Sequence, residues 1–127
     1  MVIDQKLIEK LLVDALNSDR LRQNCDMRTS VDDTSQRMLN ALQVGTNVPI
    51  HRHEETSETV ICLSGRLEEI FYEPMNESFT EFKETTRFLL APSEGTYGMQ
   101  IPKGVWHTIH VMEPSVIFEA KDGAYKV

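Results

Sequence analysis

The first stretch of the chain repeats apolar residues at three- and four-residue steps, which is the period of one helix face. Asp4 precedes this stretch and is a suitable N-cap, because its side chain can accept a hydrogen bond from the first turn. The sequence therefore predicts an amphipathic helix from residue 4 to about 17, covering an outer sheet or joining a dimer contact. The apolar positions are Leu7, Ile8, Leu11, Leu12, Ala15 and Leu16.

Further along, apolar and polar residues alternate with the period of two that is typical of strands. Residues 20–35 are polar and irregular, and they predict a loop. Gly65 predicts a tight turn between two strands that run back on each other. Seven or more short strands with one preceding helix favour a sandwich or a jelly-roll barrel. The expected strands are 37–42, a His-x-His strand near 51–53, 59–63, 67–72, 79–82, 88–90, 99–101, 106–112 and 116–121.

Two histidines, His51 and His53, stand two positions apart, and on a strand such side chains project from the same face. Glu58 follows at an odd step, so a turn over residues 54–57 is needed to bring its carboxylate back. His107 comes from a distant strand. Three imidazole nitrogens and one carboxylate oxygen suit Zn, Fe, Mn, Ni or Cu. We therefore expect one divalent transition metal at this site, with Zn, Fe, Mn or Ni as the candidates.

These residues lie in two motifs that resemble the paired motifs of the cupin superfamily. The resemblance implies a mainly all-β fold, a cupin-type jelly-roll β-barrel with an N-terminal α-helix, and a metal held by the four residues. In the second motif Gly95 lies one residue further from the proline than is usual, and Val111 replaces a common asparagine. The motifs are Gly45-x5-His51-x-His53-x4-Glu58-x6-Gly65 and Pro102-x-Gly104-x2-His107.

A closer resemblance, to the WbuC-type cupin-fold metalloproteins, covers residues 18–22, 36–42, 51–53, 101–108 and 118–125. That family is named from gene clusters for bacterial surface-polysaccharide synthesis. The resemblance implies a homodimer, because small cupins commonly pair through outer strands and the N-terminal segment. Within one domain, we expect a helix and loop over residues 1–35 that pack on a barrel formed by residues 36–127.

The composition limits the classes of partner that the chain is expected to bind. The chain has 127 residues and a formal net charge of −7, which disfavours nucleic acid and anionic membranes because both attract basic surfaces. No apolar run is long enough to span a bilayer, and no basic, apolar leader begins the chain. A cytoplasmic protein with a small-molecule ligand is the expectation. Cys25 and Cys62 are too few for a disulfide framework, so both are expected as free thiols, with Cys62 inside the barrel.

Other polar residues offer weaker candidates for chemistry. Arg37 shares a strand face with Leu39 and Ala41; it can be a surface arginine or point into the barrel mouth and clamp an anionic group. Glu119 and Lys121 alternate in phase with Ile117, so they can form a buried ion pair or supply an acid or base. Strand alternation places His110, Arg52 and Trp106 on the face that points away from the metal. Tyr97 and Tyr125 are possible hydrogen-bond donors to a substrate oxygen.

Three functions fit this sequence. The first is a non-redox metalloenzyme of isomerase or epimerase type acting on a small polar metabolite, related to sugars by the family resemblance. The metal would then act as a Lewis acid and a side chain as general base. The second is an iron-dependent dioxygenase, and the third is a module that binds a ligand through its metal without turnover.

Overall fold

The computed structural model describes residues 1–123. Its single helix, α1 (Gln5–Leu16), begins after Asp4, whose carboxylate accepts a hydrogen bond of 2.9 Å from the backbone N–H of Leu7. Ile8, Leu11 and Ala15 are buried on one face of the helix. The predicted amphipathic helix and its N-cap are therefore confirmed. No helix among the described residues is both long and apolar enough to cross a membrane.

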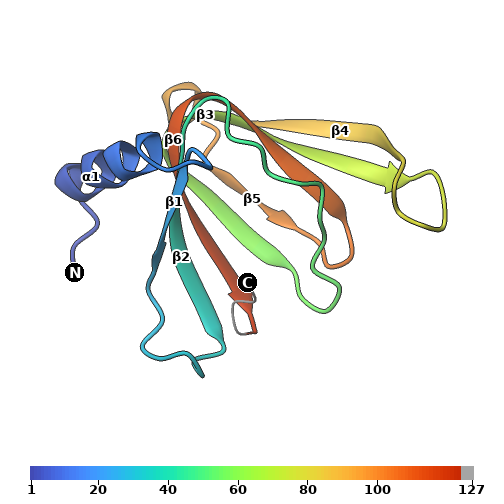
Figure 1. Ribbon diagram of the computed structural model, residues 1–127, viewed down its shortest axis with the longest axis horizontal. Helices are drawn as coiled ribbons and strands as arrows, with labels where there is room; N and C mark the ends of the chain where they lie inside the picture. Colours follow the sequence, from blue (N-terminus) through green and yellow to red (C-terminus); the bar gives the residue numbers. More distant parts are fainter. Residues whose placement is uncertain (124–127) are drawn as a thin grey trace.

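Six strands follow the helix and pair antiparallel in the order β1-β2-β6-β3-β4, with β5 alongside the first part of β3 (Figure 1). A short 3-10 helix, Pro92–Glu94, links β4 to β5. The mainly β architecture with an N-terminal helix agrees with the sequence prediction. The strands are β1 (Arg22–Asp26), β2 (Ser35–Leu42), β3 (Glu58–Pro74), β4 (Phe82–Leu90), β5 (Gly98–Ile101) and β6 (Trp106–Asp122).

The two longest strands, β3 and β6, pair with each other and bend together (Figure 1). The predicted tight turn at Gly65 is wrong, because the chain continues through this residue as one strand with shifts of register. Gly65 has a φ of 100°, and a Cβ there would overlap Ser115 and the carbonyl of Pro114. Glycine is required for the close approach of two bending strands rather than for a hairpin. The separate strands predicted at 106–112 and 116–121 are likewise one strand.

The prediction of an irregular loop over residues 20–35 is wrong for its first part. Arg22–Asp26 forms β1, which pairs with β2. Its polar residues satisfy their backbone groups in the ladder, so a lack of apolar residues did not prevent a strand. The strand predicted at 79–82 begins only at Phe82, because Phe79 adopts a left-handed φ of 55° in the loop before it. Below, the segment between β2 and β3 is called the ligand segment (residues 43–57).

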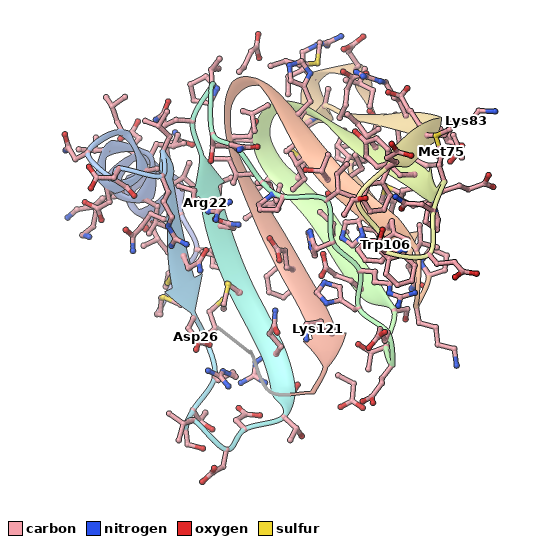
Figure 2. The ribbon with its side chains drawn as sticks, turned by 45° about the vertical axis from the view of Figure 1, so that its right-hand side comes forward. Arg22, Asp26, Met75, Lys83, Trp106 and Lys121 are labelled. Carbon is pink, nitrogen blue, oxygen red and sulfur yellow. The ribbon has the colours of Figure 1, made fainter. Side chains whose placement is uncertain are left out.

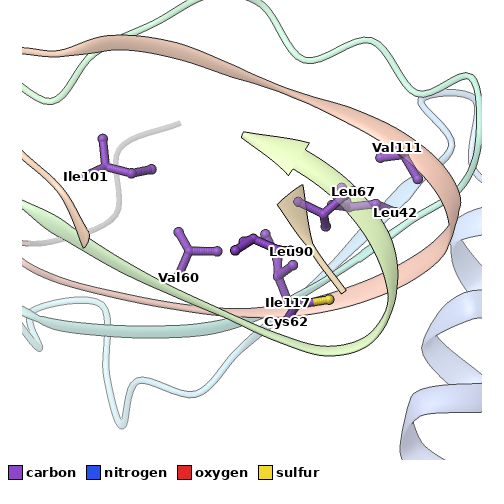
Figure 3. Packing of buried hydrophobic residues seen from close by; sticks show 8 residues of the cluster. All are labelled: Leu42, Val60, Cys62, Leu67, Leu90, Ile101, Val111 and Ile117. Carbon is purple, nitrogen blue, oxygen red and sulfur yellow. The ribbon is translucent and has the colours of Figure 1, made fainter. Parts of the chain in front are cut away.

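The sheet separates two apolar clusters. On one face of β2, Leu39 and Ala41 pack against α1. On the other face, Leu42 belongs to the interior cluster of the barrel, where Cys62 is also buried, as predicted (Figure 3). Strand alternation thus gives β2 one face toward the helix and one toward the interior. The interior cluster comprises Leu42, Val60, Cys62, Leu67, Leu90, Ile101, Val111 and Ile117.

Candidate metal centre

The ligand segment crosses the interior side of the sheet and is fixed to the beginning of β6. His51 and His107 form an isolated antiparallel bridge, with N···O distances of 3.0 and 2.8 Å between their backbones. The backbone N–H of Gly104 donates to the carbonyl of His53 over 2.7 Å. The expected His-x-His strand is thus reduced to one bridge, but that bridge is enough to fix the two histidines beside His107.

The three imidazoles face one another. Their ring centroids lie 4.3 Å apart for His51 and His107, 5.3 Å for His51 and His53, and 5.7 Å for His53 and His107. One nitrogen from each ring falls in a group whose members all lie within 4.8 Å of one another. Nitrogens this close can reach a common ion after small side-chain rotations, since metal–nitrogen bonds are about 2.0–2.1 Å long.

Backbone carbonyls orient two of the rings. The Nδ1 atom of His51 lies 2.9 Å from the carbonyl oxygen of Pro49, and that of His107 lies 2.9 Å from the carbonyl oxygen of Val105. A carbonyl only accepts, so Nδ1 carries the proton in each ring and Nε2 keeps its lone pair. Such a hydrogen bond is the usual means by which a protein fixes the tautomer and direction of a metal-binding histidine.

Glu58 adds a carboxylate at the first residue of β3. It is 6% exposed, and its Oε2 lies 2.8 Å from the Nε2 of His53. Two ligands of one ion bring their donor atoms to about 3 Å of each other, because each bond is near 2 Å long. The structure therefore brings together all four residues that the sequence selected, with three histidines in the tight group and Glu58 in contact with one of them.

Burial keeps the innermost histidine neutral. His107 is 2% exposed, and its pKa is lowered to about 4, chiefly by burial and then by the neighbouring His51. At neutral pH this ring is uncharged, which is the form that binds a metal. The donor set, its convergence and its protonation thus fit a divalent transition metal.

Two more carboxyl groups face the interior. Glu69 is 1% exposed, and its pKa is raised well above the usual value by burial and by the charges of Glu58 and Glu119. Burial, and then Glu58, raise the pKa of Glu119 to about 7. The sequence reasoning missed Glu69, although its phase with Leu67 and Phe71 on β3 indicates that it points inward.

The three weaker candidates, Arg37, Glu119 and Lys121, lie on two different faces of the sheet. Arg37 shares its face with Leu39, which packs toward α1, and its guanidinium lies 3.1 Å from Asp33. The idea that Arg37 enters the barrel mouth is therefore wrong. Glu119 and Lys121 do face the interior, in phase with Ile117. They form no ion pair within the described residues; Glu119 instead accepts a hydrogen bond of 3.3 Å from Asn40.

The residues expected to point away from the metal do so. His110 is exposed, with its Nδ1 3.3 Å from a carboxylate oxygen of Glu68. The guanidinium of Arg52 lies over the rings of Trp106 and Phe79, at 4.7 and 5.0 Å from their centroids. Trp106 thus packs against neighbouring side chains on the outer side.

Of the two tyrosines, Tyr97 lies within the described residues, and its position does not support a role in the site. Tyr97 is 59% exposed and lies between the 3-10 helix and β5. Tyr125 lies outside the described residues.

Solved structures with the same fold define the class. The chain is similar to the capsular polysaccharide assembling protein CapF from Staphylococcus aureus, with 17% identity and a TM-score of 0.63 over 86% of this chain and 30% of that one. The cupin domain of Schizosaccharomyces pombe Cnp3 matches at 10% identity and 0.60, over 80% of this chain and 64% of that one. KdgF from a Halomonas species matches at 14% and 0.58, over 83% and 80%. The fold is therefore the cupin jelly roll, here with an N-terminal helix and a group of three histidines.

Within this fold the sequence places the chain in one family. It belongs to the family described as a domain of unknown function, DUF6016, whose model matches residues 3–84. The matched range contains His51, His53 and Glu58. A comparison with curated proteins finds no match. The chain spans 30% of CapF and about two thirds of the Cnp3 cupin domain, so these likenesses concern the fold alone.

Proposed function

We propose that this chain is a metal-dependent cupin in which His51, His53, Glu58 and His107 hold one divalent transition metal. The observation that supports this most strongly is the fixed tautomer of two rings: Pro49 and Val105 accept from Nδ1, which leaves Nε2 free toward the other imidazoles. A cluster built only for packing would have no use for three imidazole nitrogens within 4.8 Å of one another in which two rings keep an unprotonated Nε2, because burying lone pairs without partners is unfavourable.

We further propose a non-redox activity of isomerase or epimerase type on a small polar metabolite. When bound, the metal supplies Lewis-acid polarisation of a carbonyl oxygen. The chain itself supplies acid and base groups: Glu119, with a pKa of about 7, can hold or release a proton near neutral pH, as a general base must. The half-buried His51 and His53 leave the site open to solvent on one side.

The biological setting is proposed from resemblance. The segments shared with the WbuC-type cupins suggest sugar chemistry in bacterial surface-polysaccharide synthesis. CapF, one of the proteins with a similar fold, is itself described as a capsular polysaccharide assembling protein. A cytoplasmic homodimer acting on a small molecule fits this setting and the net charge of −7, which disfavours nucleic acid and anionic membranes.

The test is elemental analysis of untagged protein purified without added metal, beside a His51→Ala, His107→Ala double variant. We expect close to one equivalent of a divalent metal in the wild type and its loss in the variant. Less than about a tenth of an equivalent, with no uptake on reconstitution, would overturn the metal centre.

The identity of the metal directs the activity screen. Zinc, manganese or nickel leads to sugar isomerase and epimerase assays, with the chelated protein as control. Iron together with substrate-dependent oxygen consumption would replace the proposal with the dioxygenase. Tight ligand binding without turnover under any metal would leave a binding module instead.

A further inference from the structure

Beside Glu58, the interior face of the sheet carries a row of polar side chains. In the strand register Lys121 of β6 pairs with Gln36 of β2 on one side and with Glu58 of β3 on the other. Residues paired in this way point to the same face, with Cβ atoms about 4.5–5.5 Å apart. A lysine and a glutamine therefore stand next to a proposed metal ligand, on the wall of the barrel away from α1.

The next positions on the same face extend this wall. Glu119 pairs with Met38, and Asn40 pairs with Ile117. The side-chain amide of Asn40 donates to Glu119 over 3.3 Å and so joins these two positions. We call Gln36, Asn40, Glu119 and Lys121 the polar wall. Figure 2 shows Lys121 near the end of β6, and the ligand segment passes across this side of the sheet.

Several acceptors at this wall have no hydrogen-bond partner within the described structure. Gln36 is 3% exposed, yet its Oε1 is unpaired, and so is the buried Oδ1 of Asn40. The buried Oε2 of Glu69, on the facing half of the barrel, is unpaired as well, although the raised pKa of this carboxyl group lets it donate as well as accept. A buried acceptor without a donor is strongly unfavourable. Acceptors in excess indicate that the missing partner is a molecule rich in donors, as a compound with several hydroxyl groups is.

The positive charge of Lys121 restricts the class of ligand further. Its side chain is half-buried, and none of the carboxylates in residues 1–123 lies within ion-pair distance of its ammonium group. Arg22, by comparison, donates to the carbonyl of Asn47 in the ligand segment over 3.2 Å. Lys121 interacts with the carboxyl group of Glu119 only at longer range. An ammonium group without a direct ion pair, beside oxygens that lack donors, favours a ligand that carries one anionic group.

We propose that the polar wall binds a small polyhydroxylated acid, with its hydroxyl groups donating to Gln36, Asn40 and Glu119 and its anionic group against Lys121. This inference rests on the proposed function, because it names the class of ligand held next to the metal centre. It also explains why four polar side chains interrupt a face that is otherwise apolar at Leu42, Val60 and Ile117.

Calorimetric titration of the metal-loaded protein with three probes tests the proposal. D-gluconate carries hydroxyl groups and a carboxylate, sorbitol only the hydroxyl groups, and hexanoate only the carboxylate. We expect gluconate to bind at least ten-fold more tightly than either of the others. Lys121→Met is expected to weaken gluconate at least ten-fold and to leave sorbitol unchanged, whereas Gln36→Leu weakens both gluconate and sorbitol.

Lys83→Met is the matched control, because Lys83 is an exposed lysine on β4 (Figure 2) and its removal is expected to change nothing. Lys121→Gln provides a second variant if Lys121→Met does not fold. Equal affinity for the three probes, no binding of any, or a Lys121 variant that behaves like the control would overturn the inference. Metal content is measured on the same samples, since a wild-type protein that takes up no metal overturns the proposed function whatever its affinity for gluconate.

Discussion

Strand β2 presents two different surfaces within eight residues. Toward α1, Leu39 and Ala41 are fully buried in an apolar cluster with Ile8 and Leu11. Toward the interior, Gln36 and Asn40 carry acceptors without partners. One face gains stability by excluding water, while the other retains polar groups that a stable core would omit. The contrast shows that the face toward the helix is purely a packing surface at these positions, whereas the interior face combines packing at Leu42 with polar groups that packing does not require.

The largest effect is expected at the centre of the interior side. His107→Ala removes the imidazole that is anchored to Val105 and faces the other two rings, so we expect more than a hundred-fold loss of metal affinity. Competition with a chromophoric chelator measures this directly. His110→Ala is the control, because His110 is exposed and lies on the opposite face of the same strand. Equal losses in the two variants would contradict the assignment of the ligands.

On the helix side the same kind of truncation should affect stability alone. Leu11 is 5% exposed and packs in the cluster between α1 and β2, so Leu11→Ala is expected to lower the free energy of unfolding by about 2–4 kcal/mol. Urea unfolding checks the value, and metal stoichiometry should not change. Val13→Ala, on the exposed face of the same helix, should cost less than about 0.5 kcal/mol. If Leu11→Ala released the metal, the two faces would not be independent.

The buried carboxyl groups of the interior side also make the free energy of unfolding depend on pH. In the metal-free protein the pKa of Glu119 is raised from 4.5 to about 7, so the folded state holds a proton that the unfolded state has lost. The contribution of Glu119 to stability is then greatest below about pH 4.5 and falls as the pH rises toward 7. Glu119→Gln should remove on the order of 2 kcal/mol of this fall, measured by urea unfolding at pH 5 and pH 8 with a chelator present.

Glu69 keeps its own raised pKa in this variant, so part of the slope should persist. Glu113→Gln serves as the control, because Glu113 is exposed on the same strand. A Glu119→Gln protein with the full wild-type slope would show that this carboxyl group is ionised in the folded protein, and the contrast between the two faces would weaken.

The smallest effect concerns the outer anchor of the ligand segment. Arg52 lies between His51 and His53 and packs over Trp106 and Phe79. We expect Arg52→Ala to weaken metal binding about ten-fold, since a group that holds a ligand in place typically contributes one to two orders of magnitude of affinity. Arg87→Ala, which removes an arginine of β4 paired with Glu68 and Glu84, is the comparison. Unchanged affinity in Arg52→Ala would mean that the backbone bridge alone fixes the segment.

The sequence predicted the elements whose pattern is local. The apolar face repeats along the 12 residues of the helix, and the spacing of His51, His53 and Glu58 selects residues that the structure brings together, because all three lie within one short segment. Residue types do not report how strands bend, so Gly65 was interpreted as a hairpin turn although it serves a close approach to Ser115. The sequence left two positions open for Arg37 for a similar reason: alternation tells which residues share a face but not which face meets the helix.

The polar residues that lie beside Glu58 depend on pairing between distant segments. Gln36, Lys121 and Glu58 become neighbours only through the register of β2, β6 and β3. Arg22 and Asn24 were assigned to a loop because β1 has almost no apolar residues, and only its partner β2 makes it a strand. Glu69 follows another glutamate, Glu68. Which of the two points inward can be decided only once the interior face of β3 is known.

The shared course of β3 and β6 also bears on how the chain reaches its native state. Their partners Tyr72 and Trp106 are the nearest along the sequence, and Glu58 and Lys121 are the most distant. Closing the shorter loop first loses less chain entropy, so pairing should start at the Tyr72 end and proceed through Gly65. The strand ends that carry Glu58 and Lys121 would then join last. We expect the polar wall to be the slowest part of the molecule to form and the first to open, as pulsed hydrogen exchange can resolve.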